Sequence, residues 1–296
     1  MTRRLPVSLT SLIGREHELA SIENILRRTP ARLVTITGPG GIGKTRLALE
    51  LAHRLVQHFP AGSYWVSLAS VQDPADVAAA LVSSLEIQVP AGSTPLSALT
   101  EDLSQRNALL VIDNFEQVIP AAPLLIDLLQ AGRSLRIVVT SRSVLNVTGE
   151  HRVAVDPLAL PEAQVDARAV AELAAFPAIR LFVERANAAT GAFTLSPGNA
   201  ADVVAVCRAL DGLPLAIELA AARLRHLPLA AMTARLTDRF GLLVAGPRDR
   251  PARHQALHDA IDWSYKLLPT PAQALFRRMA ALPGGCTLAT AQMLGL

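Results

Sequence analysis

The stretch ITGPGGIGKTRLALELAHRL, residues Ile36–Leu55, decides the fold of this chain. Its glycine-rich part, Gly38–Thr45, matches the pattern G-x-x-x-x-G-K-[ST] at every position. An apolar, β-branched run, Ala31–Thr37, precedes the glycines, and a helical pattern, Lys44–Gln57, follows them. A strand before the loop and a helix after it are the context that this pattern requires, so the stretch predicts a phosphate-binding loop rather than an ordinary turn.

Each residue type in this loop has a chemical reason to be there. Glycines let the backbone turn its N–H groups inward around a phosphate without Cβ clashes, and the N-terminus of the following helix favours an anion. Lys44 is placed to reach the β- and γ-phosphates, and the Thr45 hydroxyl is placed to ligate Mg²⁺. The loop residues predicted to contact a nucleotide are Gly38, Pro39, Gly40, Gly41, Ile42, Gly43, Lys44 and Thr45.

The composition of the chain argues against several classes of protein. Its 296 residues are 51% hydrophobic, yet charges interrupt every apolar segment well before the ~20 residues that span a membrane. The net charge of +3 is too small to indicate nucleic-acid binding, and two cysteines suggest neither a disulfide framework nor a cysteine-based metal cluster. We therefore expect a soluble cytoplasmic protein that has room for two or three domains.

Strand and helix signals alternate through the first half of the chain. Continuous apolar strands that alternate with helices predict a parallel sheet covered on both faces. The carboxyl ends of such strands lie on one edge of the sheet, where ligands bind in folds of this kind. The predicted strands are Ala31–Thr37, Ser63–Ala69, Ala108–Asn114, Leu135–Arg142 and His151–Val155.

Strand signals stop after Ala163, and helical patterns take over. Four helices are predicted before a Gly/Pro/Arg-rich linker, two follow it, and the last segment, LPGGCTLATAQMLGL, starts another. The helices are Arg168–Thr190, Asn199–Leu210, Leu215–His226, Leu229–Phe240, Ala256–Leu268 and Pro271–Ala281, with the linker at Ala245–Gln255. We predict an α/β domain with a P-loop over residues 1–160, an all-α helical domain over 161–244, and an incomplete third domain over 245–296.

A magnesium site needs a second oxygen ligand, and Asp113 is the best candidate. It ends the apolar run LLVID, which places a carboxylate at the edge of the sheet that faces the loop. In fast AAA-type ATPases a glutamate often follows this aspartate and activates the attacking water. Here the next residue is Asn114, which is no base at pH 7, so we expect slow hydrolysis. Glu116 is left with two interpretations: it polarises water, or it faces solvent.

Arg142 ends a second buried strand, VVTSR, at the same edge of the predicted sheet. From there its guanidinium is placed to reach a γ-phosphate through a charge-assisted contact and so to report whether that phosphate is present. The candidate catalytic residues are therefore Lys44, Asp113 and Arg142.

Taken in order, these motifs resemble the STAND signalling ATPases, which are NB-ARC/AP-ATPase-like switches. The nearest subgroup is the nucleotide-binding region of bacterial LuxR-type and SARP/AfsR-type transcriptional regulators. The resemblance covers nearly the whole chain. It rests on LTSLIGREHEL (Leu9–Leu19), Gly38–Thr45, LLVIDNFE (Leu109–Glu116), VVTSR (Val138–Arg142), DGLPLAIELAAARL (Asp211–Leu224) and a segment after the linker, from Ala256, that is similar to the opening of a winged-helix domain.

The resemblance implies functions for four further residues. Ile13 and Arg15 would lie against adenine, Arg46 would sit beside the α-phosphate, and Pro214 would bring the helical domain against the base and sugar. A single ADP or ATP with Mg²⁺ would then be shared between two domains. In this family ADP holds a closed, inactive state, and exchange for ATP permits opening and self-association. The inducer is read by a C-terminal sensor region, which this sequence does not contain.

Three points stay open at this stage. The first is whether the chain is instead an AAA-type ATPase with active hydrolysis. A regulator that binds DNA directly through the winged helix is a further alternative, and of the two it is less favoured. The second is His258, in Leu257-His258-Asp259, which is similar to a family Met-His-Asp triplet but lies too early, so we expect a surface or packing residue. The third is whether the natural chain continues past Leu296, as the incomplete third domain leads us to expect.

Overall fold

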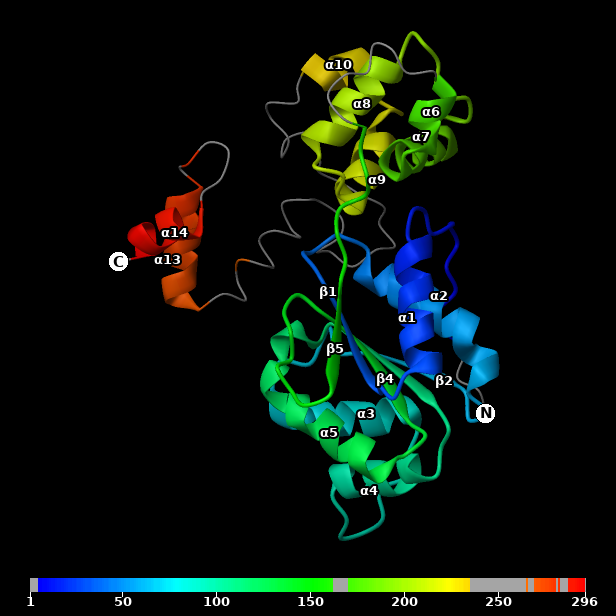
Figure 1. Ribbon diagram of the computed structural model, residues 1–296, viewed down its shortest axis with the longest axis vertical. Coiled ribbons are helices and arrows are strands. Elements are labelled where there is room, and N and C mark those ends of the chain that lie inside the picture. Colours follow the sequence, from blue (N-terminus) through cyan, green and yellow to red (C-terminus); the bar gives the residue numbers. More distant parts are fainter. Residues whose placement is uncertain are drawn as a thin grey trace.

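The protein contains a five-stranded parallel sheet with the strand order β2-β3-β4-β1-β5 (Figure 1). The structure is a computed structural model that describes residues 5–161, 170–234, 265, 269–280, 282 and 287–295. The strands are β1 (Leu33–Thr37), β2 (Ser63–Ser67), β3 (Leu109–Asp113), β4 (Arg136–Ser141) and β5 (Glu150–Ala154). All five predicted strands and their parallel pairing are confirmed, with β5 beginning one residue earlier than the prediction.

The strand order positions the functional residues. β4 lies between β1, which leads into the glycine loop, and β3, which ends at Asp113. The end of β4, at Thr140 and Ser141, therefore lies between the loop and the aspartate. Every residue of β1 and β3 is buried, as expected for strands covered on both faces.

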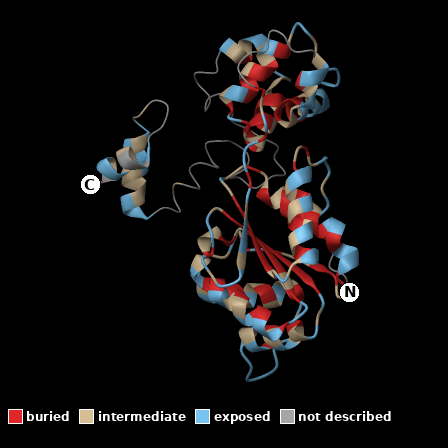
Figure 2. Ribbon diagram, viewed as in Figure 1, coloured by how far each residue is buried: buried red, intermediate tan, exposed pale blue. Residues whose placement is uncertain are grey.

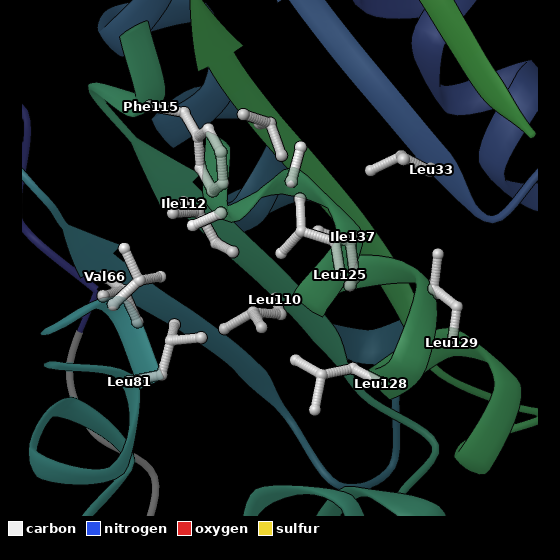
Figure 3. Packing of buried hydrophobic residues seen from close by; sticks show 14 of the residues in the cluster. Leu33, Val66, Leu81, Leu110, Ile112, Phe115, Leu125, Leu128, Leu129 and Ile137 are labelled. Atoms are coloured by element: carbon white, nitrogen blue, oxygen red, sulfur yellow. The ribbon is translucent and has the colours of Figure 1, made fainter. Parts of the chain in front are cut away.

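Alternate residues of the strands supply two separate apolar layers, one on each face of the sheet. Val34, Ile36 and Val138 pack with α1 (Glu16–Arg28) and α2 (Lys44–Leu55), whose leucines point at the sheet. Leu110 and Ile137, which point to the other face, pack with Leu125 and Leu128 of the helix α5 (Figure 3). Figure 2 shows the buried residues along the strands and on the inner faces of these helices. The second face is covered by α3 (Val77–Leu85), α4 (Pro95–Ser104) and α5 (Ala122–Ala131).

The helix α4 is a feature that the sequence analysis did not predict. Its N-terminus is fixed by Thr94, whose Oγ1 accepts a hydrogen bond from the Ser97 backbone N–H at 3.1 Å, while the Ser97 hydroxyl accepts one from the Thr94 N–H at 3.0 Å. A capping box usually has Glu or Gln in the place of Ser97, which makes this start signal weak in the sequence.

The second half of the described chain is helical, with its own apolar core around Phe182 and Ile217. One predicted helix, Arg168–Thr190, is wrong as a single element. Proline disfavours the helical conformation of the residue before it, and Phe176 accordingly lies in extended backbone before Pro177. The helices are α6 (Val170–Ala175), α7 (Pro177–Thr190), α8 (Ala200–Ala209), α9 (Pro214–Arg223) and α10 (Leu229–Ala234).

After residue 234 the structure describes little. Two helices, α13 (Thr270–Met279) and α14 (Leu288–Gly295), pack on each other, and the ring of Tyr265 lies 5.8 Å from that of Phe276. The structure does not describe the predicted linker or His258. Of the predicted helix Ala256–Leu268 it describes only Tyr265. The winged-helix prediction therefore stays a prediction. Within the described part of the chain, no helix has the length and apolar character needed to cross a membrane.

Candidate nucleotide-binding site

The glycine loop connects β1 to α2, which begins at Lys44. Three of its glycines, Gly38, Gly41 and Gly43, have φ values of +151°, +77° and +99°, a region that L side chains seldom adopt. The spacing of the glycines in the sequence therefore corresponds to a backbone that needs them. The N-terminus of α2 opens directly into this loop, where its dipole favours an anion.

Lys44 lies at the centre of the loop and is only 8% exposed. Its Nζ donates hydrogen bonds to the carbonyl oxygens of Gly38, at 2.7 Å, and Pro39, at 3.0 Å. Burial lowers the pKa of Lys44 to about 8; Glu116 and Asp113 oppose this change, and Arg142 adds to it by repulsion. An anion bound in the loop would offset the loss of solvation, so the electrostatics of this lysine favour a phosphate.

Asp113 and Thr45, predicted as the two magnesium ligands, lie side by side. Asp113 is buried, and its Oδ1 accepts hydrogen bonds from Thr45 Oγ1 at 2.8 Å and from Thr140 Oγ1 at 2.5 Å. A carboxylate and a hydroxyl are the hard oxygen ligands that Mg²⁺ takes in nucleotide sites. The donor set therefore fits this ion, with Thr45 and Asp113 as the residues that would hold it and a place for water and phosphate oxygens as the other ligands.

Arg142 and Glu116 form an ion pair that the sequence analysis did not anticipate. Arg142 Nε lies 3.1 Å from Glu116 Oε1, and the exposed fractions of the two side chains are 19% and 6%. The interpretation that Glu116 faces solvent is therefore wrong. Asn114 has a left-handed backbone (φ +67°) and donates its N–H to Thr140 Oγ1 at 3.1 Å, which turns the chain into the short 3-10 segment η3 (Phe115–Gln117) and brings Glu116 back over the sheet edge.

Lys44, Thr45, Asn114, Glu116 and Arg142 line one cavity of about 300 Å³ between the glycine loop and the helical half of the chain, whereas Asp113 is not among its lining residues. Besides Lys44, Glu116 and Arg142, the cavity has an apolar region. That region is built by both halves of the chain, with Leu12, Ile13, Leu158, Leu181, Pro214 and Leu215 among its walls. Ile13 and Pro214, named from the resemblance, therefore lie in the same cavity as the loop.

Arg15 and Arg46 also line the cavity, but each guanidinium has protein partners. Arg15 is 3% exposed; its Nη2 donates to the Ile42 carbonyl at 3.1 Å and its Nη1 to Glu18 at 2.7 Å, so it holds the start of α1 against the loop. Arg46 donates to the Thr10 carbonyl at 2.5 Å and to the Thr10 hydroxyl at 2.8 Å. Arg15 thus binds the glycine loop from the start of α1, and Arg46 of α2 binds the N-terminal segment at Thr10.

Apart from Pro214, the cavity residues of the helical half were not predicted from the sequence. Arg185 of α7 donates to Glu218 of α9 at 3.1 Å, to Glu184 at 2.7 Å, and to the carbonyl of Ser11 at 3.3 Å. Arg185, Glu218 and Ser11 all line the cavity. Because Arg185 and Ser11 are 174 positions apart, no local pattern announces this contact.

The helical half also touches the loop directly. The N–H of Leu215, in the first turn of α9, donates to the carbonyl of Gly41 at 3.2 Å. A Cβ atom at Gly41 would lie 3.0 Å from Leu215 Cβ. Behind the loop, the N–H of Leu158 donates to the Gly212 carbonyl at 2.9 Å. The loop and α9 are therefore in backbone contact at the cavity.

A family model described as an AAA domain matches residues 27–148, which include the glycine loop, Asp113 and Arg142. An uncharacterized protein of Mycobacterium tuberculosis is 35% identical over 288 residues, which are 97% of this chain and 69% of that protein. A second protein of M. tuberculosis, named as an HTH-type transcriptional regulator, is 37% identical over 87% of this chain and 28% of its own length. The regulatory protein AfsR of Streptomyces griseus is 29% identical over 79% of this chain and 23% of its own length.

One solved structure shares the fold at low identity, and a second has a lower TM-score. Drosophila ORC bound to DNA superposes with a TM-score of 0.51 at 14% identity, over 95% of this chain and 76% of the other. A STAND protein with a tetratricopeptide repeat sensor from Pyrococcus horikoshii has a TM-score of 0.47 at 16% identity, over 97% of this chain and 37% of the other.

Proposed function

We propose that this chain, which belongs to a family of P-loop proteins with an AAA domain that includes its mycobacterial relative, is a regulatory switch. In this proposal it binds ADP or ATP and hydrolyses ATP slowly. Its relatives include a protein named as an HTH-type transcriptional regulator and the regulatory protein AfsR, so the process that we propose it controls is transcription. The chain spans 28% and 23% of these two regulators, and the output would act through other parts of such proteins.

The observation that carries this proposal is the cavity with walls from both halves of the chain. The phosphate loop, with Lys44, forms part of its lining, and Pro214, Leu215 and Glu218 of α9 form another part. A nucleotide that filled it would contact the sheet and the helical half at the same time. A ligand shifts a conformational equilibrium only through contacts that differ between the states, and a ligand held between two halves makes such contacts.

Slow hydrolysis follows from the residue beside the magnesium ligand. Asn114 follows Asp113 directly, and an amide takes no proton from water at pH 7. Glu116, the carboxylate nearest in sequence on that side, is held by Arg142. A protein that keeps its nucleotide for long periods is suited to signalling rather than to mechanical work.

For the base, we propose adenine. The apolar walls at Ile13, Leu158 and Leu181 offer a flat base a dry surface, and the resemblance to STAND proteins favours adenine over guanine. We also propose self-association in the ATP state and an inducer that is read outside this chain. In the segment that resembles a winged helix, Arg278 donates to the carbonyl of Leu294 at 2.6 Å, which gives this arginine a structural partner.

The test is the nucleotide content of the freshly purified protein, released by denaturation and separated by chromatography. We expect bound ADP in a substantial fraction of molecules. Titration of nucleotide-free protein with ADP, ATP and GDP, each with and without Mg²⁺, should give tighter binding of the adenine nucleotides. Protein that carries no nucleotide and binds none of the three would refute the proposal.

A second candidate function is an AAA-type ATPase with rapid turnover. The feature that favours it is Glu116, a buried carboxylate that lines the cavity. A motor must release ADP at least as fast as it turns over, whereas a switch retains it. Measured turnover and ADP dissociation rates, both of tens per second, would favour the motor and exclude the switch.

A further inference from the structure

We propose that Glu116 sets the preference of this site for ADP over ATP, by holding Arg142 in an ion pair that a γ-phosphate has to displace. The inference rests on the proposed nucleotide binding and adds a residue that discriminates between the two nucleotides. Glu116 lies outside the glycine-loop motif; it ends the run LLVIDNFE, and the sequence alone leaves its role between polarising water and facing solvent.

Glu116 and Arg142 lie in the cavity that contains the phosphate loop. Glu116 and Arg142 come from η3 and from the residue after β4, and both line the cavity that contains Lys44. The pair is therefore close enough to the phosphate loop to interact with the terminal phosphate of a bound triphosphate.

The carboxylate of Glu116 is buried, and only one of its two oxygens has a partner among the described residues. Glu116 is 6% exposed, and Oε1 lies 3.1 Å from Arg142 Nε. Its other oxygen, Oε2, is buried and has no hydrogen-bond partner among the described residues. A buried polar atom without a partner needs an explanation, because most such atoms in proteins are hydrogen-bonded. An ion pair that bears this cost in the cavity of a phosphate site points to a functional reason for it.

Glu116 and a γ-phosphate would compete for the guanidinium of Arg142. A guanidinium held by a carboxylate has to change partner before it can bind a γ-phosphate, and the phosphate then approaches a buried negative charge. ADP brings no γ-phosphate and meets neither cost. Removing the charge of Glu116 while keeping its shape should therefore strengthen ATP binding and leave ADP binding nearly unchanged.

The experiment measures the dissociation constants of ATP and ADP by calorimetry in excess Mg²⁺ and again in EDTA. For Glu116→Gln we expect the ratio of ATP to ADP affinity to rise about tenfold, within the usual range of coupling between interacting groups. Glu116→Asp, which keeps the charge, should stay near the wild-type ratio. Arg142→Gln should lower ATP affinity about tenfold and change ADP affinity little.

The matched control is Glu50→Gln. Glu50 pairs with Arg54 on the surface of α2 at 3.1 Å, so this variant makes the same change in net charge outside the cavity. It should leave the ratio unchanged. If Glu116→Gln fails to fold, as judged by its thermal unfolding, Glu116→Ala takes its place, with the same expected rise in the ratio of ATP to ADP affinity.

The outcomes separate the inference from the proposed function. Wild-type protein that binds neither nucleotide refutes both. Wild-type protein that binds both, with Glu116→Gln changing the two affinities equally or not at all, refutes only the role of Glu116. In that case the ion pair would serve solely to fix η3 against the sheet.

Discussion

Replacing Gly41 by alanine should separate the phosphate loop from the helical half of the protein. Gly41 has φ +77°, and a Cβ atom added there would lie 3.0 Å from Leu215 Cβ and 3.2 Å from Leu215 Cδ2. The same residue accepts the hydrogen bond from the Leu215 N–H. Both the steric contact and the hydrogen bond therefore involve the first turn of α9.

The size of the effect follows from comparison with Gly43. Gly43 also has a positive φ, +99°, but a Cβ atom there would meet nothing within 4 Å. Backbone strain is thus common to both alanine variants, and the overpacking against Leu215 belongs to Gly41→Ala alone. Overpacking of a well-packed contact costs about 1–3 kcal/mol. Because 1.4 kcal/mol is a factor of ten, this cost corresponds to roughly a five- to 140-fold change in a local opening equilibrium.

Hydrogen exchange at the Leu215 amide, followed by NMR in nucleotide-free protein, measures that opening. We expect exchange in Gly41→Ala to be faster than in Gly43→Ala by roughly five- to 140-fold. Amides in the sheet core, such as those of β3, should exchange alike in both variants, which shows that the whole domain has not been destabilised.

Equal exchange at Leu215 in the two variants would refute this reasoning. That result would mean that α9 does not depend on the loop for its position. Faster exchange in Gly43→Ala than in Gly41→Ala would refute it as well, since only backbone strain acts at Gly43.

Four further results are expected. Lys44→Ala should weaken binding of both ADP and ATP about tenfold to a hundredfold in a titration, because it removes a charged donor worth about 1.5–3 kcal/mol; unchanged affinity would contradict the loop assignment. Asp113→Asn should reduce the gain in ATP affinity that Mg²⁺ produces, measured as the ratio of dissociation constants with and without the ion, and an unaltered ratio would rule Asp113 out as a ligand. The pKa of Lys44 is lowered from 10.5 to about 8, so between these pH values the unfolded chain binds a proton that the folded protein has lost. The free energy of unfolding, measured by urea titration, should therefore rise with pH in this window. The rise should be smaller in Lys44→Met. Arg185→Ala removes bonds that join α7, α9 and the N-terminal segment, and should speed proteolysis of the chain between the two halves, whereas Arg54→Ala, on the surface of α2, should leave the cleavage rate unchanged.

Much of the sheet and of the loop is predictable because their signals are local. A buried parallel strand such as LLVID is a continuous apolar run, and Gly38–Thr45 is a contiguous motif whose glycines have the positive φ values that only glycine adopts easily. The helix break at Phe176 was also readable, since Pro177 restricts the residue before it.

The remaining features depend on contacts between distant parts of the chain. Glu116 and Arg142 are 26 positions apart, and they meet because β4 pairs with β3 and because Asn114 turns the chain back. The contact between Arg185 and Ser11 spans 174 positions. The sequence contains these residues without any spacing that links them, so only the strand order and the packing of α7 and α9 bring them to the cavity.

The geometry assigns two properties of the proposed switch to different residues. Discrimination between nucleotides would lie with Glu116 and Arg142, both on the sheet side of the cavity. Contact with α9 lies with Gly41, whose carbonyl accepts the Leu215 N–H. Lys44 lines the same cavity as the ion pair and donates to the carbonyls of Gly38 and Pro39 in the loop. If phosphate binding and the position of α9 are coupled through this loop, linkage requires that each changes the equilibrium of the other by the same factor.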